Sequence, residues 1–104
     1  MRAELGTDLS KALSDCDQAV KARPDNASYL DSRGLVRLRM GDNDKAVRDY
    51  DASLAINPRS AWSLYGRGLA KQHLGDKAGG QKDIDAAVAI DAHLPERAKK
   101  LGVS

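Results

Sequence analysis

The sequence predicts an all-α protein built from repeated pairs of antiparallel helices. Residues recur at a spacing of 34, and within each unit the apolar residues fall at helical spacing. No stretch shows the sustained alternation and β-branched enrichment that strands require. The 104 residues suffice for one small domain or a few short repeats. Aromatic residues make up only 4%, so we expect a core of mostly aliphatic side chains and alanine.

The repeat is visible as identical residues one period apart. The matches are Pro24 and Pro58, Arg33-Gly34-Leu35 and Arg67-Gly68-Leu69, Gly41-Asp42 and Gly75-Asp76, and the Asp-x-Asp triplets that begin at Asp15, Asp49 and Asp83. So many matches at one offset define complete repeats at 27–60 and 61–94. Residues 7–26 match the second half of a preceding repeat, so we expect the chain to be part of a longer array.

Each repeat is expected to contain two helices. In 43–56 the apolar side chains fall on one face, and 9–23 follows the same pattern, as does 77–90 more weakly. The stretches 27–40 and 61–74 are apolar on more than one side, which is typical of helices packed between neighbours.

Turn and capping residues separate these expected helices. Gly41 and Gly75 lie where a helix would end in the left-handed conformation, and the aspartate after each glycine can cap the next helix. A proline breaks the chain before each repeat. The residues expected to cap the first helix of each repeat are Asn26 and Ser60.

A 34-residue helix–turn–helix unit of this kind resembles the tetratricopeptide repeat. The residues that carry the pattern are Leu30, Gly34, Gly41, Ala46, Tyr50, Ser53 and Pro58, then Leu64, Gly68, Gly75, Gly80, Ile84 and Ala87. The resemblance implies a single domain over 1–104, a tetratricopeptide-like helical-repeat solenoid wound into a right-handed superhelix. Residues 95–104 look like a partial capping helix.

The chain departs from the family pattern at several positions. Arg37 and Lys71 replace a tyrosine late in the first helix, and Ala92 replaces the closing proline of the second repeat. Gly80 stands where alanine is usual, and each glycine inside a helix costs about 1 kcal/mol relative to alanine. We therefore expect a weaker last helical pair.

In proteins of this family, the first helix of each repeat lines a concave groove that holds a partner segment. The residues at the matching positions are Asp31, Leu35, Leu38, Arg39, Trp62, Tyr65, Leu69 and Gln72. Trp62 and Tyr65 are the expected anchors, because aromatic side chains bury much area with little loss of rotamer freedom. The alternative is that one of them packs as core. The Lys/Asn/Arg clamp of some relatives is absent, which favours an apolar or mixed partner segment.

The Asp-x-Asp triplets do not form a metal site, because side chains two apart on a helix point about 200° apart. We interpret them as structural, with Arg33 and Arg67 pairing with Asp15, Asp49 or Asp83. His73 and His93 have no second ligand at metal spacing. Cys16 takes the place of a core aromatic and is expected to be a buried structural thiol. We therefore expect no catalytic residues, no metal site and no cofactor.

Other partners find little support in the sequence. A net charge of +2 makes no strong field, so nucleic acid binding is not expected. No apolar run approaches the roughly 18 residues that span a bilayer, so membrane insertion is not expected either. The N-terminus does not resemble a signal peptide, and the localisation is left open.

The sequence thus predicts a non-enzymatic module or scaffold for protein–protein interaction, which binds a partner segment in its groove. The alternative is a self-assembly or spacer unit of a longer repeat array, with no selective groove ligand. A half repeat at the start would leave one apolar face partly uncovered. The residues of that face, through which we expect a homo-oligomer or helix exchange, are Leu9, Leu13, Cys16 and Val20.

Overall fold

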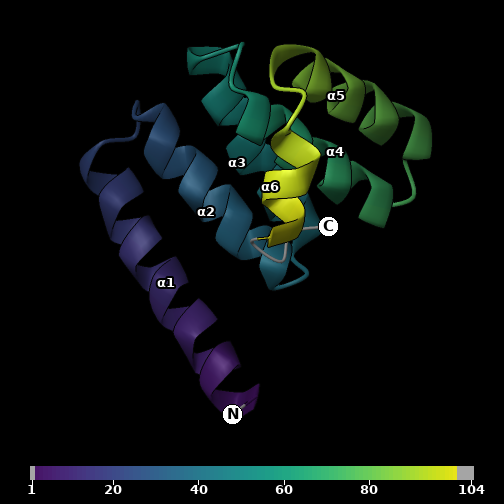
Figure 1. Cartoon of the computed structure of the whole chain (residues 1–104). Helices are drawn as coiled ribbons and strands as arrows, with labels where there is room; N and C mark the ends of the chain where they lie inside the picture. The colour runs from purple at the N-terminus through teal and green to yellow at the C-terminus, as the bar shows by residue number, and fades with distance from the viewer. Residues whose placement is uncertain (1, 101–104) are drawn as a thin grey trace.

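Six helices and no strand make up residues 2–100, the part of the chain that the computed structural model describes (Figure 1). Side chains are described from residue 9 onward. The helices are α1 (Arg2–Ala22), α2 (Ala27–Arg39), α3 (Asn43–Ile56), α4 (Ala61–His73), α5 (Lys77–Ile90) and α6 (Leu94–Lys100). The predicted all-α class is confirmed. The helix pair α4 and α5 begins 34 residues after α2 and α3.

The predicted helix ends are found at their residues. The side chain of Asn26 accepts a hydrogen bond from the Tyr29 backbone N–H at 3.0 Å, and Ser60 caps α4 in the same way. Gly41 and Gly75 have positive φ angles of 82° and 95°, which only glycine adopts without strain. These glycines let each second helix reverse direction and pack against the first.

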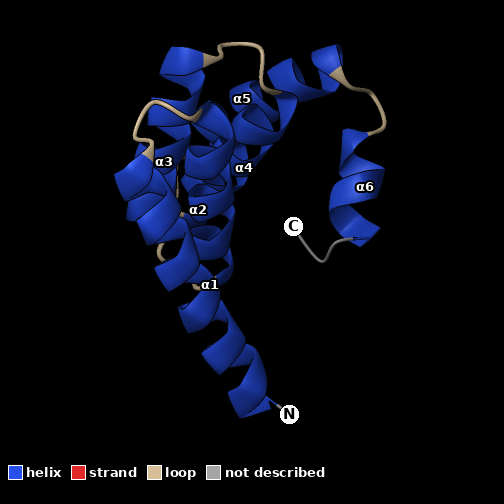
Figure 2. Ribbon diagram, turned by 90° about the vertical axis from the view of Figure 1, so that its left-hand side faces the viewer, coloured by secondary structure: helices blue, strands red, loops and turns tan. Residues whose placement is uncertain are grey.

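Neighbouring helices pack in chain order from α1 to α5, and α2 also lies beside α4. In Figures 1 and 2, α3 lies on one side of α2 and α4, and α6 lies on the opposite side. We call the surface of α2 and α4 that turns away from α3 the α2/α4 face. The chain thus leaves the helix stack after α5 and returns across this face.

Tyr50 of α3 is the largest side chain that is almost completely buried, at 1% exposure. Its ring fits between α2 and α4 because both helices carry a glycine there. A Cβ on Gly34 would lie 3.0 Å from the ring, and a Cβ on Gly66 would overlap it. Burial raises the pKa of Tyr50 far above its usual range. The two glycines therefore serve the packing of three helices around one aromatic ring.

Gly80 permits a close approach of α4 and α5. A Cβ at this position would lie 2.5 Å from the carbonyl oxygen of Gly68 and 2.5 Å from Cγ of Gln72. The alanine that is usual here would therefore not fit. The sequence suggested that Gly80 weakens the last pair, whereas its missing side chain is what lets these two helices pack.

Two arginine side chains link neighbouring helices, and each contacts aspartates 16 residues before and 16 residues after it in the chain. Arg33 of α2 contacts Asp17 of α1 at 3.2 Å and Asp49 of α3 at 2.8 Å. One repeat later, Arg67 contacts Asp51 at 2.9 Å and Asp83 at 2.8 Å. The predicted pairing of these arginines with Asp49 and Asp83 is confirmed.

The second aspartate of each triplet has a role that the sequence analysis missed. The prediction named Asp15 as a partner of an arginine, whereas Asp17, the second residue of that triplet, makes the contact with Arg33. Asp51 does the same for Arg67. Asp49 and Asp83 thus pair with an arginine of their own repeat, whereas Asp17 and Asp51 pair with the arginine of the next repeat.

Arg37 and Lys71 join the same network of ion pairs. Arg37 contacts Asp49 at 2.9 Å, and Lys71 contacts Asp83 at 3.1 Å. Burial raises the pKa of Asp83, but hydrogen bonds from Arg67 and Lys71 outweigh it and lower the pKa below its ordinary value. Each of these carboxylates is thus held between two cations.

α1 lies at the edge of the molecule and packs on α2. Of its predicted apolar face, Val20 is 8% exposed, while Leu9, Leu13 and Cys16 are half-buried. Cys16 is therefore less buried than predicted, although burial, followed by the charges of the two neighbouring aspartates, raises the pKa of its thiol. The face is partly covered by α2 and partly open.

We expect Arg33→Ala to lower the free energy of unfolding by about 1–3 kcal/mol, because Asp49 has an exposure of only 4% and loses one of its two cations. Urea denaturation measures the change. The exposed Arg48 is the matched control, and its alanine variant should stay within about 0.5 kcal/mol of wild type. Equal stability of the Arg33 variant and wild type would show that the ion pairs do not hold the helices together.

We expect Gly80→Ala to be destabilising by about 1–3 kcal/mol, although alanine is the better helix former, because the new methyl group meets a backbone carbonyl. Thermal unfolding followed by circular dichroism measures the change. Ala89→Gly, at an exposed position of the same helix, gives the propensity effect alone. A more stable Gly80 variant would contradict the close packing of α4 on α5.

Candidate functional site

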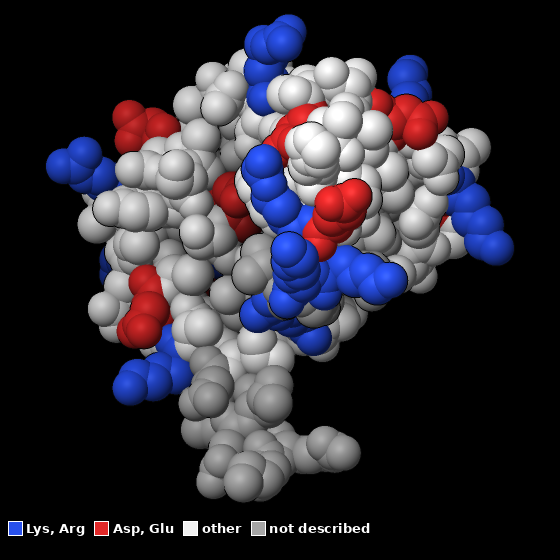
Figure 3. Space-filling model, viewed as in Figure 1, with Lys and Arg blue, Asp and Glu red and all other residues white. Residues whose placement is uncertain are grey.

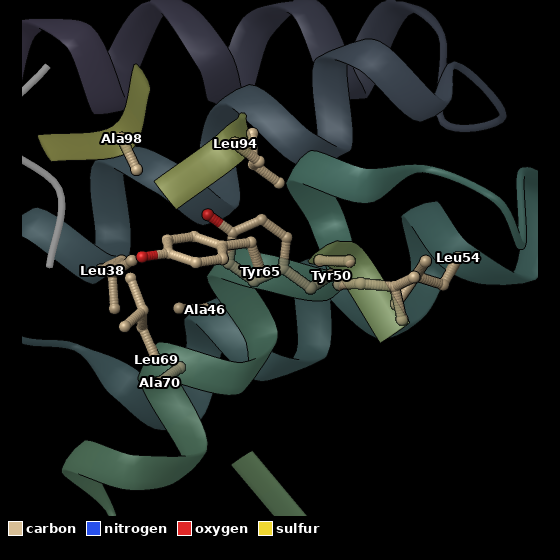
Figure 4. Packing of buried hydrophobic residues seen from close by; sticks show 11 residues of the cluster. Leu38, Ala46, Tyr50, Leu54, Tyr65, Leu69, Ala70, Leu94 and Ala98 are labelled. Atoms are coloured by element: carbon tan, nitrogen blue, oxygen red, sulfur yellow. The ribbon is translucent and has the colours of Figure 1, made fainter. Parts of the chain in front are cut away.

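The helix α6 lies on the α2/α4 face with its two small apolar residues turned inward (Figure 4). Leu94 and Ala98 are both 0% exposed and belong to the same buried cluster as Leu38 of α2 and Tyr65 and Leu69 of α4. Figures 1 and 2 agree in placing α6 over this side of the molecule. Part of the predicted groove is therefore filled by the chain itself.

The outer side of α6 is charged. Lys99 and Lys100 are exposed, and Figure 3 shows basic side chains gathered where α6 lies. Arg97 contacts Asp91, which lies in the short connection between α5 and α6, at 2.8 Å. The helix is thus amphipathic, with Leu94 and Ala98 one turn apart on its inner side.

A polar hollow lies at one end of the α2/α4 face, next to α3. A hollow of about 260 Å³ lies where the beginnings of α2 and α4 meet the end of α3. Its lining residues are Ala27, Ser28, Asp31, Ser32, Ser53, Asn57, Ser60 and Trp62. A smaller hollow adjoins it, lined by Asp31, Leu35, Tyr50, Trp62, Tyr65 and Gly66. Asp31 and Trp62 line both.

The carboxylate of Asp31 is held by a chain of serine hydroxyls. Ser63 donates to Asp31 at 2.7 Å. The hydroxyl of Ser53 lies 2.9 Å from that of Ser63 and 3.1 Å from the carbonyl oxygen of Ala27, and it donates its one hydrogen to one of the two. Both serines are nearly fully buried. This chain connects α2, α3 and α4 and fixes the position of the carboxylate.

Asp31 differs from the other half-buried or buried carboxylates of the repeats because no lysine or arginine of the described residues forms an ion pair with it. Asp49 and Asp83 each have two cations within 3.1 Å. Burial raises the pKa of Asp31, and the hydrogen bond from Ser63 offsets this only in part. The carboxylate therefore destabilises the folded protein when it is charged.

The structure separates the eight predicted groove residues into three groups. Four line the hollows together, namely Asp31, Leu35, Trp62 and Tyr65. Leu38 and Leu69 are buried in the cluster that includes α6, as Tyr65 is in part. Gln72 packs on Gly80 of α5, and Arg39 is exposed and lines neither hollow.

Several residues of this face were missed by the sequence analysis. The serines that hold Asp31 lie on other helices, and nothing in the one-dimensional pattern joins Ser53 to Ser63. The spacing of four between Leu94 and Ala98 was available as a signal of an amphipathic turn, but the sequence does not reveal which surface that turn covers. Both require the helices to be placed in space.

Other kinds of site find no support in the described residues. Within 9–100, no three His, Cys, Asp or Glu side chains are grouped so that they could hold a metal ion. His73 lies at the surface near the start of α3, where Nδ1 is 3.1 Å from Oδ1 of Asn43. None of the described helices is both long enough and apolar enough to cross a membrane.

Comparisons with known proteins do not assign this chain to a family. No protein-family model matches the sequence, and a search of curated proteins gives no match.

We expect Asp31→Asn to raise the melting temperature at pH 7 and to have little effect at pH 3. The pKa of Asp31 is raised in the folded protein, so its charge reduces stability as the pH rises from the ordinary aspartate pKa through the raised value. The amide of asparagine removes that charge and still accepts the hydrogen bond from Ser63. Calorimetry at both pH values, with Asp44→Asn as an exposed control, tests this. A lower melting temperature at pH 7 would show that the charged carboxylate stabilises the fold.

Proposed function

We propose that this protein is a non-enzymatic, tetratricopeptide-like interaction module that binds a segment of another protein across its α2/α4 face. The 34-residue period of the sequence and the matching helix pairs support the repeat interpretation. The observation that carries the binding proposal is α6, which buries Leu94 and Ala98 completely against this face. The face thus accepts a short amphipathic helix.

The contact with α6 is suited to exchange with a partner. A helix of seven residues is too short to be stable alone, since isolated helices need about 12–15 residues. It is held on the face by its short connection to α5, which makes the contact intramolecular. A partner helix that is longer and carries apolar residues four apart would bury more area on the same residues and displace α6.

The hollow beside α6 adds selectivity to this surface. Apolar contacts on Leu38 and Leu69 distinguish poorly between partner segments, because one apolar side chain can replace another. The partly buried carboxylate of Asp31 and the indole ring of Trp62 require a matching group at a matching position in the partner segment. The face therefore combines an apolar part that supplies affinity with a polar part that selects.

The second candidate function is self-assembly through α1. Leu9, Leu13 and Cys16 are half-buried at the edge of the helix stack, where a further helix would cover them. In this case the chain would form oligomers through α1, and the α2/α4 face would select no ligand. Sedimentation equilibrium over a hundredfold concentration range separates the two functions.

We expect a random-peptide display selection on the full chain to enrich peptides whose binding is lost in Trp62→Ala. Leu94→Asp, which removes the inner contact of α6, should strengthen binding of the same peptides about threefold to tenfold because the competing helix is released. Lys99→Asp, on the outer side of α6, is the control and should leave the affinity unchanged.

Circular dichroism must first show that each variant keeps its helical content. Ala98→Arg serves as a second way to release α6 if Leu94→Asp does not fold. No enriched peptide on wild type or on either released variant, or equal binding by the Trp62 variant, would reject the groove function and leave self-assembly through α1.

A further inference from the structure

We propose that the hollow between Asp31 and Trp62 binds the cationic side chain of a lysine or arginine in the partner segment. This inference rests on the proposed function and names the chemistry that the groove selects. Asp31 and Trp62 line both hollows, so both side chains can contact the same ligand.

The charge of Asp31 favours a cationic ligand. A carboxylate taken out of water is costly unless it is paired, and this fold pairs its other buried carboxylates closely. Asp49, for example, lies within 2.9 Å of both Arg33 and Arg37. Among the described residues, Asp31 receives one hydrogen bond, from the Ser63 hydroxyl at 2.7 Å, and no ion pair. An ammonium or guanidinium group in the hollow would supply the missing counter-charge, and binding would recover the cost of burial.

The other residues that line the hollow also suit a cation. Trp62 presents an indole in the same hollow, and an indole is the aromatic side chain that attracts cations most strongly. Serine hydroxyls and the amide of Asn57 supply further acceptors for the N–H groups of a cation. A phosphate or carboxylate would be repelled by Asp31, and an apolar side chain would leave Asp31 without a counter-charge. The lining thus favours a cation over other groups.

No basic side chain of α6 is among the residues that line the hollow. Arg97 pairs with Asp91 at 2.8 Å, and Lys99 and Lys100 are exposed. The hollow, at about 260 Å³, is open to a side chain from outside. Because no lysine or arginine is among the residues that line it, the hollow has room for a basic side chain from a partner.

The hollow is continuous with the surface that α6 covers. Tyr65 lines the smaller hollow and also belongs to the buried cluster that contains Leu94 and Ala98. A partner helix in the place of α6 could therefore set apolar residues against Leu38 and Leu69 and extend a basic side chain toward Asp31. The expected partner segment is amphipathic, with one lysine or arginine beside its apolar residues.

The direct test is a titration of the full chain, followed by the NMR signal of the Trp62 indole N–H. The probes are the N-acetyl methylamides of lysine and arginine, with that of norleucine as an uncharged control. We expect the cationic probes to bind at least tenfold more tightly than norleucine. Asp31→Asn should abolish this preference, whereas Asp44→Asn, at an exposed position of α3, should retain it. Equal shifts with norleucine, or an unchanged preference in Asp31→Asn, would overturn the inference.

The peptide selection separates this inference from the proposed function. Peptides with a lysine or arginine at one fixed position, lost when the selection is repeated on Asp31→Asn, support both. Peptides that need Trp62 but have no fixed basic residue overturn the cation site and leave the groove function standing. Binding of the cationic probes with no selected peptide overturns the proposed function and identifies the hollow as a site for a free ammonium or guanidinium compound.

Discussion

The arrangement of the first three helices depends on one side chain, Arg33, which bridges α1 and α3 from its place on α2. Arg67 repeats this arrangement around α4. Because the aspartates lie two apart in the triplet, each can serve a different arginine, one in its own repeat and one in the next. The bridges thus connect α1 to α2, α2 to α3, α3 to α4 and α4 to α5.

The same network explains why Asp31 stands apart. Arg33, Arg37, Arg67 and Lys71 pair with aspartates of the triplets, and among the described residues Asp31 receives a hydrogen bond from Ser63. A fold that neutralises its other buried carboxylates and leaves one partly buried and unpaired accepts a cost in stability. Unpaired charges of this kind are concentrated at functional sites, where a ligand can supply the counter-charge.

Packing around glycine determines the shape of the face. Gly34 and Gly66 admit the ring of Tyr50 between α2 and α4, so the two helices share one layer. Tyr65 is brought to the border between the apolar part under α6 and the polar hollow. Helix propensity predicted that Gly80 weakens the last helix pair. Propensity describes an isolated helix, however, and not the distance between two packed helices.

The sequence by itself determined the helices, the caps at Asn26, Ser60 and Asp76, and the pairing of Arg33 with Asp49 and of Arg67 with Asp83, because these follow from local propensity and a fixed period. It also gathered Asp31, Leu35, Trp62 and Tyr65 on one face, since residues at equal positions of successive repeats share a side. Only the tertiary structure decided that Gln72 turns to α5, that Ser53 and Ser63 hold Asp31, and that α6 returns over the face. The serine contacts and the packing of Gln72 depend on how closely neighbouring helices approach, and the position of α6 depends on where the chain turns after α5. No local signal in the sequence fixes either.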